Sequence, residues 1–206
     1  AGEMVEFPGG MQGMALNLAT DNVGIVIFGN DRDVKEGDVL LGLASDGVHS
    51  NGYSLVRRVV EMSGLAWDDA APFADVSLGE ALLAPTRLYV KPALAAIKMG
   101  GVHALAHITG GGLTENLPRV LPDDLGADID LDAWELPPVF RWLAETGGMA
   151  EAELLKTFNA GVGMVLSVDA DKADDIIALL KAEGETVYTL GTVTAGEGVR
   201  YTGALK

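Results

Sequence analysis

The protein is 206 residues long and 49% hydrophobic, with a formal net charge of -16 and no cysteine. The absence of cysteine excludes disulfides, thiolate zinc sites and a cysteine nucleophile, and the acidic charge argues against nucleic-acid or membrane-surface partners, which favour basic proteins. No apolar run approaches the ~20 residues of a membrane span, and no signal-peptide pattern is present. We therefore expect a cytoplasmic globular protein.

Hydrophobic periodicity divides the chain into alternating groups of strands and helices. The expected strands are residues 22–29, 38–45, 102–108, 126–132, 161–169, 186–194 and 197–203. The expected helices are residues 50–64, 86–99, 113–121, 137–148, 149–158 and 170–184.

Capping and turn residues refine this assignment. Gly64 is a plausible stop for the first helix, and the acidic stretch 66–80 is expected to be a loop. Asp171 is expected to cap the last helix, which Gly184 would end. The final two strands could form a hairpin around the "AGEG" segment. The mixture of strands and helices favours an α/β mixed (α+β) fold, a layered sandwich in which helices flank a mixed β-sheet.

A glycine-rich turn follows the strand expected at 102–108. Backbone N–H groups at a strand–turn–helix junction can bind an anion, and Gly110, Gly111 and Gly112 leave room for close approach. Thr109 adds a hydroxyl group. The turn lacks the Lys-Ser/Thr pair of a Walker loop and the glycine spacing of a Rossmann turn. On local grounds it is either a phosphate cradle or a plain tight turn.

A second polar turn, "SDGVHSNGYSL" at 45–55, also leads from a strand into a helix. Ser50 and Asn51 are hydrogen-bonding residues that favour helix caps and turns. The same residues are suited to a polar ligand loop. Both interpretations remain open.

The chain has three histidines, His49, His103 and His107. His103 and His107 share one face of an expected strand, but four residues in a strand span about 13 Å. We therefore expect no joint metal site. His107 lies beside the glycine turn, where it could hydrogen-bond or move a proton.

Arg87 and Asn159 complete the candidate residues. Arginine suits a bidentate grip on phosphate or carboxylate, although a surface ion pair is an equally good interpretation. Asn159 directly precedes a strand that contains Gly161 and Gly163, and glycine in a strand often marks close backbone approach.

Four separated stretches share the order and spacing of motifs in one enzyme family. They are "GVHSNGYSLVRRVVE", "LLAPTRLYVKPAL", "VHALAHITGGGLTENLPRVLP" and "TFNAGVGMVLSV". Together they resemble phosphoribosylformylglycinamidine cyclo-ligase, also called AIR synthetase, from about residue 36 to near the C-terminus. Selenophosphate synthetase, thiamine-monophosphate kinase, a hydrogenase maturation protein and an amidotransferase of purine synthesis belong to the same superfamily. The combination of "HSNGYSL" with "HITGGG" favours the cyclo-ligase.

The resemblance implies a cytoplasmic, homodimeric, two-domain ligase of purine biosynthesis. Residues 36–206 would form its C-terminal domain. Residues 1–35 would be a remnant of the N-terminal ATP-binding domain, because "GEMVEFPGG" is similar to the family's "GETAEMPGM". ATP and Mg²⁺ would be bound mostly by the missing part of that domain. The implied reaction is the ATP-dependent ring closure of formylglycinamidine ribonucleotide to aminoimidazole ribonucleotide.

The resemblance also implies roles for the candidate residues. His49 or His107 would be the acid/base residue, and no protein metal site is expected in this half. The expected substrate- and phosphate-binding residues are Ser50, Asn51, Arg87, Thr109, Gly110, Gly111, Gly112 and Asn159. Two alternatives remain, namely a non-catalytic binding or dimerisation fragment and a sibling ATP-dependent kinase or synthetase.

Overall fold

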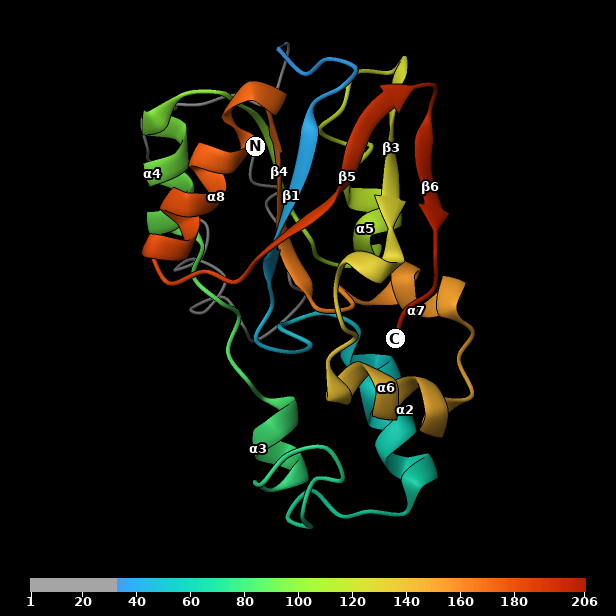
Figure 1. The fold of residues 1–206 in the computed structure, drawn as a ribbon. Coiled ribbons are helices and arrows are strands. Elements are labelled where there is room, and N and C mark those ends of the chain that lie inside the picture. Colours follow the sequence, from blue (N-terminus) through green and yellow to red (C-terminus); the bar gives the residue numbers. More distant parts are fainter. Residues whose placement is uncertain (1–32) are drawn as a thin grey trace, which may run out of the picture.

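The computed structural model describes residues 33–206, which are built around a six-stranded sheet with the order β2-β4-β1-β5-β3-β6 (Figure 1). Neighbouring strands are antiparallel except β3 and β6, which are parallel. The mixed sheet confirms the expected fold class, whereas the strand expected at 22–29 lies outside the described residues. The strands are β1 (Val39–Ala44), β2 (Val102–His107), β3 (Leu125–Asp130), β4 (Val162–Val168), β5 (Val187–Ala195) and β6 (Gly198–Thr202).

The central strand β1 separates two apolar cores. Successive side chains of a strand point to opposite faces, so Leu40 packs into one core while Leu41 and Leu43 pack into the other. All three leucines are buried. This burial on both faces explains why the run is continuously apolar instead of alternating with polar residues.

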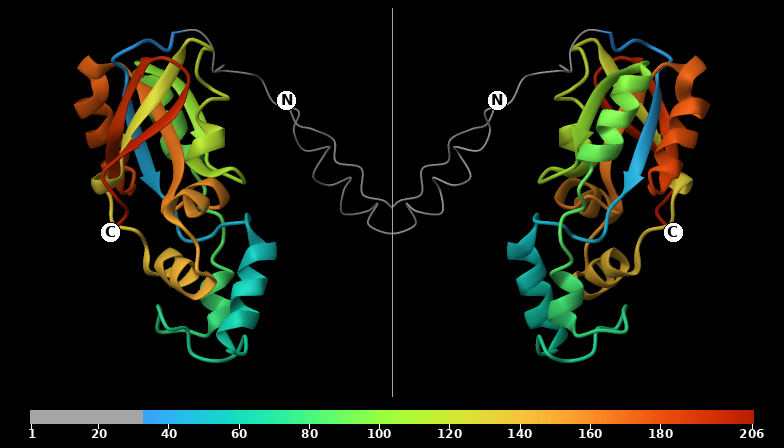
Figure 2. Two further views of the ribbon diagram at one scale, coloured as in Figure 1. Left: turned by 90° about the vertical axis from the view of Figure 1, so that its right-hand side faces the viewer. Right: turned by 90° about the vertical axis from the view of Figure 1, so that its left-hand side faces the viewer.

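Helices cover both faces of the sheet. Helices α4 and α8 pack side by side over one core, while α5 and α7 cover the other (Figures 1 and 2). Helices α2, α3 and α6 extend the second core below the strands (Figure 1). None of the helices within 33–206 has the length and apolar character needed to cross a membrane. The helices are α2 (Tyr53–Ser63), α3 (Leu78–Leu82), α4 (Val90–Met99), α5 (Gly112–Asn116), α6 (Pro138–Gly147), α7 (Glu151–Thr157) and α8 (Ala173–Ala182).

Two helix assignments in the first half need correction. The segment expected to be a loop at 66–80 contains the start of α3, whose cap is Ser77; its hydroxyl accepts the Glu80 N–H at 3.3 Å. Helix α4 begins at Val90 and not near Thr86. Pro92 therefore lies in the first turn, where its missing N–H costs no hydrogen bond.

Two further helix ends differ from expectation. Asp171 does not cap α8, because it lies within a 3₁₀ turn, Ala170–Lys172, and Lys172 occupies the cap position. Helix α5 ends at Asn116, before Pro118, and is shorter than the expected 113–121. Gly64 ends α2 in a left-handed conformation, as predicted.

The hairpin expected between the last two strands is wrong. Strand β3 lies between β5 and β6, pairing antiparallel with the first and parallel with the second. A side chain at Gly126 of β3 would lie 2.7 Å from the Gly198 carbonyl and 2.8 Å from the Gly196 carbonyl. Because Gly126 has no side chain, the connection between β5 and β6 can pass close to β3.

Candidate functional site

Three adjacent strands bring the predicted ligand loops to one end of the sheet. Strands β1 and β2 both run antiparallel to β4, which lies between them. The segments that follow β1 and β2 therefore meet the segment that precedes β4. These three segments, 45–52, 108–112 and 158–161, are called the loop cluster below.

Asn159 joins two segments of the loop cluster. Its side-chain oxygen accepts hydrogen bonds from the Ser45 hydroxyl and the Gly161 N–H, both at 2.9 Å, and its amide donates to the Gly47 carbonyl at 2.9 Å. The residue is 2% exposed. Asn159 therefore holds the cluster in shape from beneath, and its predicted ligand contact stays a prediction.

His49 is also an anchor of the loop. Its backbone has a positive φ of 59°, and its ring is buried. Nε2 accepts the N–H groups of Asp46 at 3.1 Å and Arg87 at 3.4 Å, which places the proton of the neutral ring on Nδ1. Burial lowers the pKa of His49. The geometry thus favours a neutral ring that fixes the loop, and the predicted acid/base role stays a prediction.

Arg87 is committed to partners within the protein. Its Nε contacts Glu185 at 2.8 Å and one terminal nitrogen contacts Asp46 at 2.9 Å. The other terminal nitrogen donates to the Gly184 carbonyl at 3.2 Å. The guanidinium therefore clamps the loop after β1 to the segment that precedes β5, an ion-pair role that was one of the two interpretations of its sequence.

The two polar turns identified in the sequence contact each other. The Asn51 side-chain oxygen accepts the Gly110 N–H at 3.1 Å. Ser50 lies beside Thr86, with 3.0 Å between their hydroxyl oxygens. Residues 59 positions apart in the chain thus form one polar surface, and Ser50 and Gly110 are exposed on it.

The glycine turn depends on a residue that the sequence analysis did not single out, Asn116. Its buried amide donates to the Gly112 carbonyl at 2.7 Å and the Gly110 carbonyl at 3.2 Å, and its oxygen accepts the Thr109 hydroxyl at 3.2 Å. Asparagine is a poor residue for a helix interior. Its presence in an apolar helical pattern was the available signal.

Gly112 is required by close packing. Its φ is +57°, and a side chain there would collide with the Leu155 carbonyl and lie 2.7 Å from the Phe158 carbonyl. Gly111 has a φ of +98°, and its missing side chain leaves room for the carboxylate of Glu115. Of the three glycines, only Gly110 has open space above it, so Gly110 is the position in the turn at which a ligand could approach.

His107 ends β2 on the exposed side of the loop cluster. Its ring lies edge-on to Tyr89, with 6.2 Å between ring centroids. Partial burial lowers the pKa of His107. The Tyr89 hydroxyl donates to the Ala44 carbonyl at 2.7 Å, so this tyrosine, also missed in the sequence, fixes the surface against which His107 packs.

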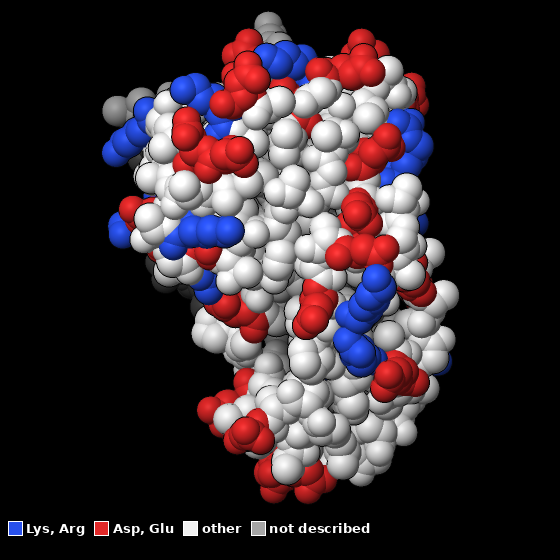
Figure 3. Space-filling model, in the orientation of Figure 1, with Lys and Arg blue, Asp and Glu red and all other residues white. Residues whose placement is uncertain are grey.

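Charge around the loop cluster is mixed. Glu115 lies at the glycine turn and is partly balanced by Lys156 at 3.5 Å and Arg119 at 3.9 Å. On the face in Figure 3, acidic groups are scattered and basic groups occur beside them without forming a broad basic area. Recognition at the loop cluster would therefore depend on neutral hydrogen-bonding groups more than on net positive charge.

The fold and the loop cluster define an α+β domain in which three strand ends build a polar surface from backbone and short side chains. The model of the AIR synthase related protein family, C-terminal domain, matches residues 35–203. The chain therefore belongs to this family, as the resemblance of its motifs implied at the coarser level. A second model, of the ATP synthase alpha/beta family beta-barrel domain, matches residues 1–42, most of which lie outside the described residues.

Solved structures share the fold. Thiamine-monophosphate kinase from Stenotrophomonas maltophilia K279a is 18% identical, with a TM-score of 0.60 over 86% of this chain and 53% of that one. E. coli HypE, a hydrogenase maturation protein, is 21% identical, with a TM-score of 0.55 over 85% and 49%. A protein from Thermus thermophilus is 26% identical, with a TM-score of 0.54 over 85% and 52%. The chain thus spans about half the length of these relatives.

Proposed function

We propose that this chain is the C-terminal half of an ATP-dependent kinase or synthetase, and that the loop cluster forms one wall of its substrate cleft. The observation that carries the proposal is the hydrogen bond between Asn51 and Gly110, which joins the two turns suited to ligand binding. The name of thiamine-monophosphate kinase, a protein with the same fold, supports ATP-dependent chemistry. Family membership supports the same class.

The loop cluster is suited to positioning a phosphorylated small molecule. Ser50 provides an exposed hydroxyl group, and the Cα of Gly110 is open to approach, whereas the Gly110 N–H and the Thr109 hydroxyl already donate to Asn51 and Asn116. Such groups orient a substrate without a protein nucleophile, which suits phosphoryl transfer because catalysis there rests on positioning and electrostatics. His107 is the better placed of the two predicted acid/base residues, since it is exposed whereas His49 is buried.

The loop cluster does not by itself fit ATP with Mg²⁺. Mg²⁺ takes carboxylate and phosphate oxygens, but the one group of three potential metal ligands within 33–206 lies at the opposite ends of the strands. Arg87 is already paired with two carboxylates. We therefore assign ATP and Mg²⁺ mainly to the other half of the enzyme.

A second candidate is the cyclo-ligase itself. The specific observation in its favour is that the "HSNGYSL" and "HITGGG" motifs, whose combination resembles this enzyme, meet in the loop cluster. ATP would phosphorylate the formyl oxygen of formylglycinamidine ribonucleotide with release of ADP, and an amidine nitrogen would then close the imidazole ring with loss of phosphate. The loop cluster would hold the ribonucleotide, and the enzyme would be a homodimer.

An ADP-release assay on the enzyme that contains both halves separates the candidates. Formylglycinamidine ribonucleotide as the preferred substrate would establish the cyclo-ligase, and thiamine monophosphate a sibling kinase. If formylglycinamidine ribonucleotide or thiamine monophosphate bound without ADP release, the result would favour a non-catalytic binding module. Failure of every phosphorylated substrate to bind would refute the proposed cleft.

The structure also selects the variant that tests the cleft wall. Gly110→Asp adds a carboxylate at the open position, where the new Cβ would lie 3.9 Å from the Asn51 side-chain oxygen and no nearer to any other group. We expect substrate affinity to fall at least about tenfold, because like charges repel at close range, while thermal stability stays near that of the wild type. Ala66→Asp, on an exposed loop away from the cluster, is the matched control. Equal affinity in both variants would contradict the assignment.

A further inference from the structure

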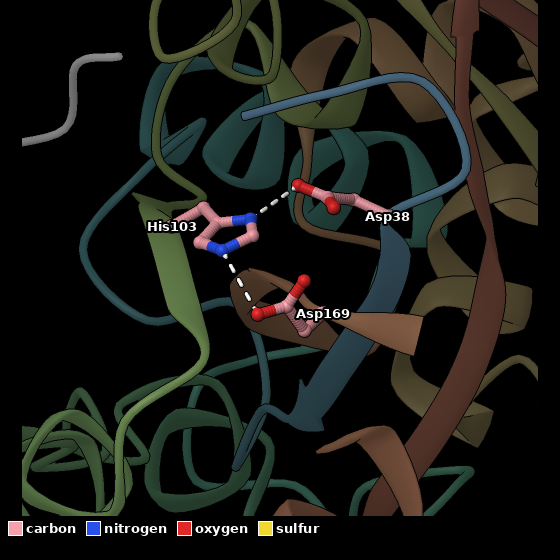
Figure 4. A group of neighbouring side chains, drawn as sticks. All are labelled: Asp38, His103 and Asp169. Carbon is pink, nitrogen blue, oxygen red and sulfur yellow. Dashed lines mark hydrogen bonds and ion pairs between the residues drawn. The ribbon is translucent and has the colours of Figure 1, made fainter. Parts of the chain in front are cut away.

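The ends of the same three strands that lie opposite the loop cluster carry a second group of polar side chains (Figure 4). Asp38 precedes β1, His103 lies near the start of β2, and Asp169 follows β4. One potential ligand atom from each of the three lies within 4.8 Å of the other two. Of the three residues, only His103 lies within the motifs that build the loop cluster.

The tautomer of His103 is fixed by Asp38. The Asp38 carboxylate is fully buried, and its Oδ2 accepts hydrogen bonds from the Ser167 hydroxyl at 3.0 Å and the Lys35 N–H at 3.2 Å. The same oxygen lies 2.7 Å from His103 Nδ1. An oxygen that already accepts two hydrogen bonds is best completed by a third donor, so Nδ1 carries a proton. In the neutral ring, Nε2 then carries no proton and keeps a lone pair.

That lone pair faces a second carboxylate. His103 Nε2 lies 3.3 Å from Asp169 Oδ2 (Figure 4), which is longer than the about 2.7–2.9 Å of a charge-assisted hydrogen bond. Two ligands at about 2.0–2.2 Å from a tetrahedral metal ion lie about 3.4 Å apart. The separation between Nε2 and Oδ2 therefore matches that of two ligands bound to one metal ion. In metal sites, a ligating histidine usually donates its other N–H to a carboxylate or similar acceptor, as His103 does here.

A second observation concerns the charge beside this gap. Oδ1 of Asp38 is buried and has no hydrogen-bond partner among the residues that the structure describes. In Figure 4 one Asp38 oxygen points toward His103 and the other away from it, so this carboxylate lies beside the gap and does not point into it. A buried carboxylate oxygen without a partner is costly unless a cation or donor satisfies it.

We propose that His103 Nε2 and Asp169 bind a divalent transition-metal ion of the zinc class, with Asp38 orienting the histidine and adding negative charge beside the ion. Mixed imidazole and carboxylate ligands favour such ions over Mg²⁺. The side chains of His103 and Asp169 are 11% and 33% exposed, so water can complete the coordination. This site, if zinc binds, would revise the expectation of no protein metal site in this half, and it is independent of the proposed ATP chemistry.

Lys35 competes with the ion. Its ammonium group lies 2.5 Å from Asp169 Oδ1 and lowers the pKa of that carboxyl, but 61% of the Lys35 side chain is exposed and can move away. Removing this amine in Lys35→Met should therefore raise zinc affinity. If the pair between Lys35 and Asp169 were only a structural salt bridge, neither the wild type nor Lys35→Met would bind zinc.

Zinc titration of the 206-residue chain, followed by calorimetry near neutral pH, tests the site. We expect one saturable Zn²⁺ per chain, at least tenfold weaker binding in Asp169→Asn and His103→Gln, and no comparable binding of Mg²⁺. His107→Gln, which removes a histidine from the other end of the same strand, is the matched control and should bind zinc as the wild type does. Absence of saturable binding, or equal affinity in Asp169→Asn, would overturn the proposal. Asp169 is partly exposed, so its variant keeps the test valid if His103→Gln does not fold.

Discussion

The two ends of strands β2, β4 and β1 are built on different physical principles. At the loop cluster, shape comes mainly from glycines, backbone N–H and carbonyl groups, and buried neutral amides such as Asn116 and Asn159, with one ion-paired clamp at Arg87. At the opposite end, charged side chains meet, with His103 between Asp38 and Asp169. The same residue type behaves differently at each end, since His107 stands exposed without a carboxylate partner in the described part of the chain. The residue type of a side chain therefore says less about its role than the strand end at which the side chain lies.

The largest expected effect is at the backbone-built end, in Gly112→Ala. The new methyl group would collide with the Leu155 carbonyl and force a positive φ on a residue with a side chain, so the free energy of unfolding should fall by about 3 kcal/mol or more. Urea denaturation measures it. Gly110→Ala, which meets nothing closer than 3.9 Å, should change it by less than about 0.5 kcal/mol. Similar losses in the two variants would remove the distinction between packed and open glycines.

Asn116→Ala should be the next most damaging change. It leaves the carbonyl of Gly112 without its amide donor in a buried setting, which should cost about 2 kcal/mol. Thr109→Val removes one hydroxyl of the same network and should cost about half as much. Hydrogen exchange of the 109–112 amides provides a second measurement. Unchanged protection in Asn116→Ala would show that the glycine turn keeps its shape without this residue.

The pH dependence should report on the neutral histidine of the loop cluster. Burial places the folded-state pKa of His49 below its ordinary value of 6.5, so the unfolded state binds more protons as pH falls below that value, and stability is lost there. The free energy of unfolding should therefore fall as the pH is lowered from about 7 to about 5. His49→Gln should flatten the profile of unfolding free energy against pH. A profile as steep as that of the wild type would assign the pH dependence elsewhere, His107 being the next group to test.

The smallest effect is expected at the charged end, in Lys35→Met without added metal. The pair between Lys35 and Asp169 is largely solvent-exposed, and exposed ion pairs contribute little to stability. Denaturation curves of the variant and the wild type should coincide within error at about 0.15 M salt, the physiological ionic strength. A clear loss of stability would show that the charged end, like the loop cluster, supports the fold.

Local sequence patterns predicted most of the elements between residues 36 and 206. Strand periodicity identified the apolar run of β1, and helical periodicity with Gly64 identified α2 and its end. These features depend on neighbouring residues and on backbone preferences, which a linear pattern records. The short α3 was missed because a five-residue helix has too few turns for a periodic signal.

Tertiary structure decided which distant segments meet. The insertion of β3 between β5 and β6 turned an expected hairpin into a parallel pair. It also decided that Arg87 pairs with Glu185, 98 residues away, and that His103 meets Asp38, 65 residues away. The sequence supplied the side chains of both strand ends, but a local pattern does not encode strand order. Their partners, and with them their charge states and roles, follow from which strands lie next to each other in the sheet.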